Sequence, residues 1–142
     1  MYTTLLVLHF VGLALGVGTS FAFLTLGLAV RSLPPAERAA FMLRAFALSK
    51  NGSIGLLLLL VSGVAMLAVR GVGPTFALAG PLFHLKLTLV AVMLGPFGYL
   101  QVLMKRAKQQ GGGPLMARIP KVGQVMLLLG LAVIVTATLA FH

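Results

Sequence analysis

The sequence contains no cysteine, no tryptophan and only one carboxylate side chain, Glu37. The lack of cysteine excludes disulfides, iron–sulfur clusters, thiolate-bound zinc and covalent attachment of a c-type haem. With a single carboxylate, the chain has no paired acids for acid–base catalysis, no carboxylate proton relay and no carboxylate cage for a metal ion. These classes of chemistry are therefore not available within this chain.

Charge is also scarce, since Asp, Glu, Lys and Arg make up 8% of the 142 residues whereas 60% are hydrophobic. A water-soluble domain of this length cannot bury so much apolar surface, but a lipid bilayer absorbs it. Four apolar runs, at about residues 3–30, 53–69, 81–104 and 122–141, reach or approach the roughly 20 residues that cross ~30 Å of hydrocarbon. The sequence predicts a single all-α integral membrane domain over residues 1–142, built as a bundle of four transmembrane helices.

Basic residues concentrate in two of the three connections between these runs. The first and third connections carry Arg31, Arg38, Arg44, Lys50, Lys105, Arg106, Lys108, Arg118 and Lys121. Because positive residues accumulate on the cytoplasmic side, this asymmetry predicts an N-out/C-out, multi-pass protein of the inner (cytoplasmic) membrane. The net charge of +10 then reflects orientation and contact with anionic lipid, and no nucleic-acid partner is expected.

The first connection has the features of a helix start. Pro34 and Pro35 end the preceding helix, and Glu37 follows in the next first turn. Residues 36–50 are amphipathic, with Phe41 and Leu48 on the apolar side, which predicts a short cytoplasmic helix on the membrane surface or extending the second span. The middle connection, residues 70–80, is rich in glycine and proline and is expected to be a loop.

Two of the three histidines, His9 and His84, lie near the start of the first and third runs. These two spans run in the same direction, so at 1.5 Å per residue the rings are expected within ~5 Å of the same depth. Ionisable groups at membrane depth usually face the protein interior and mark a function. Histidines on two facing helices are the ligands by which a membrane helix bundle holds haem b, which predicts this cofactor with iron bound by His9 and His84.

Small residues follow each histidine along one helix face. Gly16 and Ser20 lie below His9, and Ala91 and Gly95 lie below His84. These residues are predicted to give the porphyrin room to enter between the helices. The alternative is that both faces are packing seams and that the histidines only form hydrogen bonds between helices. Gly12 and Gly16 form a GxxxG pair, which predicts a close helix approach.

Lys86 is the alternative ligand to His84. The two residues are about 200° apart around a helix, so they cannot both point into one site. Lys86 shares its face with bulkier side chains, which favours His84 as the inward residue and Lys86 as a snorkelling side chain or a partner of a haem propionate. Alternatively, a neutral Lys86 is the iron ligand in place of His84. Copper remains a further alternative cofactor, because Met66 is expected at the depth of the histidines and thioethers suit Cu(I).

Several short motifs resemble the HemJ-type protoporphyrinogen oxidases and the related CopD-like family of small four-helix membrane proteins. They are Leu8-His9, a basic stretch ending at Asn51, Ser62-Gly63, and Phe83-His84-Leu85-Lys86-Leu87 ahead of a helix that ends in Lys105-Arg106. The similarity extends over nearly the whole chain. Because the first span lacks a histidine and a tyrosine near its end, and no tryptophan precedes the third span, the chain resembles a divergent member.

The resemblance implies a haem b protein that oxidises protoporphyrinogen in the membrane. It implicates His9 and Lys86, and less directly Asn51 and Arg44. The residues themselves predict a b-type haem protein that transfers electrons, with quinone or porphyrin as a small-molecule partner. Two alternatives stay open, namely an accessory subunit packed in a larger respiratory or photosynthetic membrane complex and a protoporphyrinogen oxidase-like enzyme. A homodimer is also expected if a glycine-rich face is not used internally.

Overall fold

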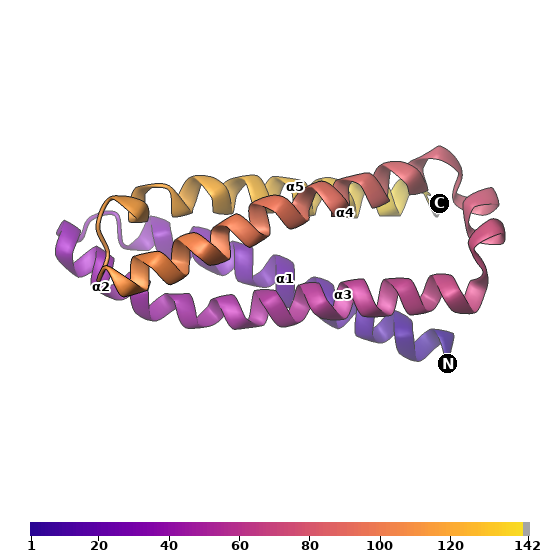
Figure 1. The fold of residues 1–142 in the computed structure, drawn as a ribbon, viewed down its shortest axis with the longest axis horizontal. Helices are drawn as coiled ribbons and strands as arrows, with labels where there is room; N and C mark the ends of the chain where they lie inside the picture. Colours follow the sequence, from indigo (N-terminus) through magenta and orange to yellow (C-terminus); the bar gives the residue numbers. More distant parts are fainter. Residues whose placement is uncertain (141–142) are drawn as a thin grey trace.

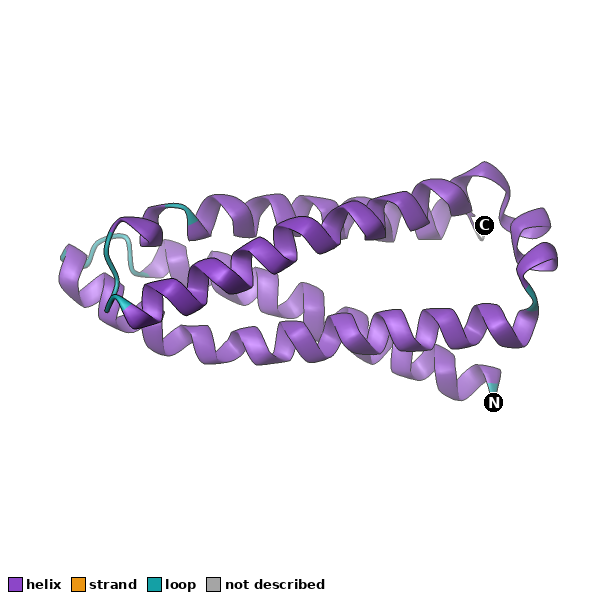
Figure 2. Ribbon diagram, in the orientation of Figure 1, coloured by secondary structure: helices purple, strands orange, loops and turns teal. Residues whose placement is uncertain are grey.

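The computed structural model describes residues 1–140, and over that range the chain is helical and has no strand (Figures 1 and 2). The elements in chain order are α1 Tyr2–Ala29, α2 Pro35–Ala45, the 3₁₀ turn η1 Phe46–Leu48, α3 Ser49–Arg70, α4 Val72–Gln109, the 3₁₀ turn η2 Pro114–Ala117 and α5 Ile119–Ala140. The helical segments that contain α1, α3, α4 and α5 are each long and apolar enough to cross a bilayer. The predicted all-α architecture with four such helices is confirmed, although Phe141 lies outside the described residues.

The bundle consists of two tightly packed helix pairs. α1 packs mainly on α3 and α4 mainly on α5, while α1 also touches α5 and α3 contacts α4 much less. Three glycines explain how closely α1 and α3 approach. A Cβ on Gly12 would lie 2.8 Å from the carbonyl oxygen of Gly55, and a Cβ on Gly55 would lie 2.6 Å from the amide nitrogen of Gly16. The packing role of the small residues at positions 12 and 16 is confirmed.

The connection between α1 and α3 forms the predicted short helix. Pro35 occupies the first turn of α2 with Glu37 behind it, and Arg38 Nη2 donates to the carbonyl oxygens of Arg31 at 2.8 Å and Leu33 at 3.1 Å. Phe41 on the predicted apolar face is 41% exposed, whereas Phe46, which lies outside that face, is fully buried and packs into the bundle. The α-helical repeat stops at Ala45 and tightens to a 3₁₀ turn, so a face counted at 100° per residue through position 48 does not persist.

The predicted loop at residues 70–80 is wrong over most of its length, because α4 already begins at Val72. Gly71 takes a positive φ of 86° and ends α3. The Thr75 hydroxyl donates to the Gly71 carbonyl at 2.8 Å, and Ala79 packs in a buried cluster with Phe83 and Ala140. That burial outweighs the weak local helix preference. The helix then kinks at Gly80, where φ is 57° and ψ is −151°.

The two ends of the bundle differ in charge. We call the end with α2 and η2 the basic end, because it holds Arg31, Arg38, Arg44, Lys50, Lys105, Arg106, Lys108, Arg118 and Lys121. The N-terminus and the last turn of α5 lie at the opposite end, beside the α3–α4 connection (Figure 1). His9 and Lys86 belong to the half of the bundle near the termini.

Candidate functional site

His9 is held in one orientation by α3. Its half-buried ring has Nδ1 2.9 Å from the Ser62 hydroxyl oxygen, and that hydroxyl in turn donates to the Leu58 carbonyl one turn earlier on α3. In the tautomer that has its proton on Nδ1, the ring donates to Ser62 and the hydroxyl proton stays in the bond to Leu58. In this tautomer the lone pair of the neutral ring lies on Nε2. Gly63 lies beside the imidazole, since a Cβ there would be in van der Waals contact, 3.5 Å from the His9 Cε1 atom.

Lys86, and not His84, is the α4 residue that faces His9. Lys86 is half-buried and lies within electrostatic reach of His9, and its Nζ lies 6.0 Å from the centroid of the Phe83 ring. His84 is exposed and packs against the Phe76 ring with the centroids 4.4 Å apart. The prediction that His84 points inward is wrong in this respect.

The rotation of α4 has a physical cause. Phe83 is 7% exposed and anchors one helix face in the bundle, and Lys86 follows three residues later on that face. Val90, Met93 and Phe97 continue the same face and are all half-buried. The sequence predicts that the bulky side chains face outward to the lipid, but α4 has few contacts with α3 and needs these larger groups to fill the interior.

Of the two predicted small-residue faces, the one on α1 points into the bundle and the one on α4 points outward. Gly16 and Ser20 on α1 line an internal cavity, and the Ser20 hydroxyl donates to the Gly16 carbonyl at 3.2 Å. Ala91 and Gly95 on α4 are exposed, as are the neighbouring Thr88 and Gly98. The inward orientation predicted for Ala91 and Gly95 is therefore wrong, while cofactor binding by any of these residues stays a prediction.

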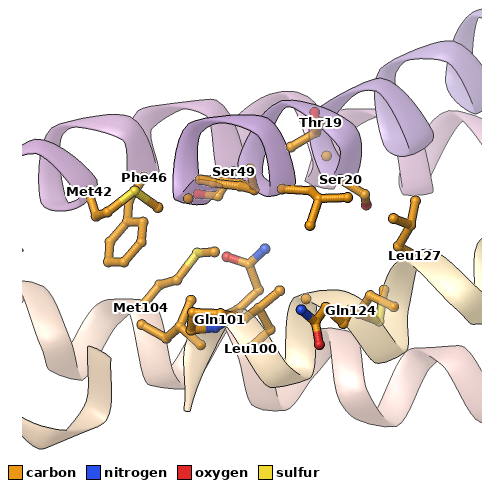
Figure 3. A pocket seen from close by; sticks show the side chains of 18 of the residues that line it. Thr19, Ser20, Met42, Phe46, Ser49, Leu100, Gln101, Met104, Gln124 and Leu127 are labelled. Carbon is orange, nitrogen blue, oxygen red and sulfur yellow. The ribbon is translucent and has the colours of Figure 1, made fainter. Parts of the chain in front are cut away.

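The cavity has a volume of about 850 Å³ and lies between the α1–α3 pair and the α4–α5 pair. Figure 3 shows side chains from both layers facing each other across it, among them Thr19, Ser20, Met42, Phe46, Ser49, Leu100, Gln101, Met104, Gln124 and Leu127. Gln101 Nε2 donates to the Ser53 hydroxyl at 3.2 Å and so links α4 to α3. One feature of the sequence indicates this cavity, namely the glutamines Gln101 and Gln124 inside two otherwise apolar spans.

The ionisable donors near His9 are its own imidazole and the amine of Lys86, on two different helices. Within residues 1–140, no group of three or more histidine or carboxylate side chains is placed to hold a metal ion. A haem iron needs only one or two protein ligands, because the porphyrin supplies the others. The Nε2 lone pair of His9 and the amine of Lys86, on two different helices, fit that requirement.

In comparisons with known proteins, no family model matches the chain, and neither a curated protein nor a solved structure matches it. The resemblance to the HemJ-type and CopD-like proteins therefore stays a prediction that rests on the short motifs. The positions it implicates most directly, His9 and Lys86, are the two that the fold brings near each other.

Proposed function

We propose that the chain is a multi-pass protein of the cytoplasmic membrane that binds haem b between α1 and α4 and carries electrons. His9, through Nε2, and Lys86, as the neutral amine, would hold the haem iron. The observation that supports this most is the His9 ring, fixed through Nδ1 by Ser62 while Lys86 of a different helix lies within electrostatic reach. A haem b held there supplies one-electron redox chemistry.

Each neighbouring residue has a definite part in this proposal. Ser62 holds the imidazole in the tautomer that a metal-binding histidine requires, as outer-shell hydrogen-bond partners commonly do. Phe83 covers the Lys86 side chain from the interior of the bundle and keeps water away from it.

The proposed orientation places the basic end in the cytoplasm and both termini outside, which follows from the positive-inside bias of the two basic connections. His9 and Lys86 are then nearer the outer leaflet. Membrane quinol is the proposed electron donor, and the acceptor is a partner at the outer surface.

The absorption spectrum of the purified protein tests the proposal. After expression with ample haem supply, we expect a Soret band and a haem-to-protein ratio of about one, as one His9–Lys86 site requires. Reduction with dithionite is expected to sharpen the α band, as in other six-coordinate b-type haems. A protein that is folded by circular dichroism but has no Soret band would contradict the haem assignment.

A second candidate is an accessory subunit that packs against another membrane protein or a second copy of the chain. It is favoured by the exposed face of α4 that contains Thr88, Ala91, Gly95 and Gly98, since small residues let a neighbouring helix approach closely. Leucine at Gly98 is expected to abolish association detected by chemical crosslinking in membranes. Leucine at Gly18, an exposed glycine of α1 with no atom within 4 Å of its Cβ position, is the control and should leave it intact.

A further inference from the structure

The cavity between the helix pairs is long and narrow. Its lining runs from Leu13 to Leu28 on α1 and on to Arg31 beyond the helix end, and from Ile119 to Val133 on α5, which at 1.5 Å per residue corresponds to about 23 Å along α1 and about 21 Å along α5. With a volume of about 850 Å³, these lengths give a mean cross-section of about 30–40 Å². Such a shape suits one extended hydrocarbon chain better than a flat macrocycle.

The inner wall offers little to a charged ligand. The hydroxyls of Thr19 and Ser20 donate back to carbonyls of their own helix, at 2.7 Å and 3.2 Å, and the Gln101 amide donates to Ser53. Most of the remaining lining is apolar and includes Met42, Met93, Met104, Met116 and Met126. Flexible thioether side chains adapt to a chain of variable shape. The part of a ligand that lies here is therefore mainly apolar, with Ser49 and Gln124 as polar contacts (Figure 3).

The mouth of the cavity has the opposite character. At the basic end the lining includes Arg31 and Arg38, whose exposure marks an opening there, and it does not include Glu37. The bonds from Arg38 Nη2 to the carbonyl oxygens of Arg31 and Leu33 hold that guanidinium at the α1–α2 turn. Two arginines without a neighbouring acid in the lining match a carboxylate or a phosphate, to which guanidinium binds with bidentate geometry.

We propose that this cavity binds a single-chain anionic amphiphile, with its hydrocarbon chain between α1 and α5 and its headgroup on Arg31 and Arg38. The shared chemistry is a carboxylate or phosphate on one long chain, whether it comes as a free fatty acid or as a lysophospholipid. This site is separate from His9 and Lys86 and does not depend on haem binding, because the lining on α1 begins at Leu13 and that on α4 at Met93.

The test uses the full chain, purified in a neutral detergent, with a fluorescent fatty acid as the probe. Palmitate and palmitoyl lysophosphatidate are expected to displace it, and the better competitor identifies the headgroup. Hexadecanol, which has the chain but no charge, is expected to compete roughly tenfold more weakly, as loss of a charged hydrogen bond predicts. Absence of probe binding, or equal competition by hexadecanol and palmitate, would overturn the proposal.

Two variants with matched controls locate the ligand. Gly123 lines the cavity with no atom within 4 Å of its Cβ position, so Gly123→Leu fills the cavity and should reduce probe binding at least tenfold, whereas Gly18→Leu should not. Arg31→Gln should weaken the binding of palmitate roughly tenfold and leave the binding of hexadecanol unchanged. Arg106→Gln removes the same charge from an exposed position at the basic end outside the lining and should change neither. Equal effects of a variant and its control would argue against the site.

Discussion

Replacing His9 with alanine is expected to remove haem from the protein. The substitution deletes the Nε2 ligand and also the ring that Ser62 orients through Nδ1. The loss of affinity should exceed the roughly 10–100-fold that removal of an outer-shell partner costs, because the metal–nitrogen bond itself is lost. The haem-to-protein ratio, measured from the pyridine haemochrome of purified protein, checks this result.

His84→Ala is the matched control for that experiment. His84 is two residues from Lys86 but is exposed and packs on Phe76, so its loss should leave the haem ratio unchanged. The haem affinity of Ser62→Ala is expected to lie between those of His9→Ala and His84→Ala, about 10–100-fold below that of the unchanged protein. If His84→Ala loses haem while His9→Ala retains it, the assignment of ligands is wrong.

Gly55→Leu is expected to separate α1 from α3 and to destabilise the bundle by about 3 kcal/mol, the upper part of the usual range for overpacking. A Cβ at position 55 would lie 2.6 Å from the Gly16 amide nitrogen and 2.7 Å from the Gly12 carbonyl oxygen. These are backbone atoms, so no change of rotamer relieves the contact. Thermal unfolding in detergent, followed by circular dichroism, should show a lowered midpoint and a lower yield of folded protein.

Gly18→Leu controls for the general effect of a larger residue on a glycine-rich span. Gly18 is exposed on α1 and no atom lies within 4 Å of its Cβ position. The unfolding midpoint of Gly18→Leu should therefore equal that of the unchanged protein. A normal midpoint for Gly55→Leu would mean that α1 and α3 are not in such close contact in the membrane.

The sequence was sufficient for the helices but not for how α4 is rotated. Apolar run length predicted the helices now seen as α1, α3, α4 and α5, and the Gly12–Gly16 spacing predicted a close helix contact that proved to be with Gly55. The predicted rotation of α4 is wrong because its small residues face outward and not into the bundle. α4 instead lies apart from α3 and fills the gap with Phe83 and other bulky side chains, which is a tertiary effect that helix periodicity alone cannot reveal.

The site was predictable in its residues but not in their pairing. His9, His84 and Lys86 all stood out as ionisable groups in apolar spans, yet only the fold shows that Ser62 orients His9 and that Lys86 is its neighbour. The cavity could not be predicted, because its lining comes from α1, α2, α3, α4, α5 and η2 together. Gln101 and Gln124 reach it from helices that are otherwise apolar, and their meeting depends on the packing of the two helix pairs.

The identity of the two iron ligands is the central claim, and the near-infrared magnetic circular dichroism of the oxidised, haem-loaded protein measures it most directly. The low-spin charge-transfer band lies at different energies for histidine–amine and bis-histidine coordination. Ligation by His9 and Lys86 predicts the histidine–amine position and its loss in Lys86→Met. A band at the bis-histidine position that persists in Lys86→Met would contradict the claim.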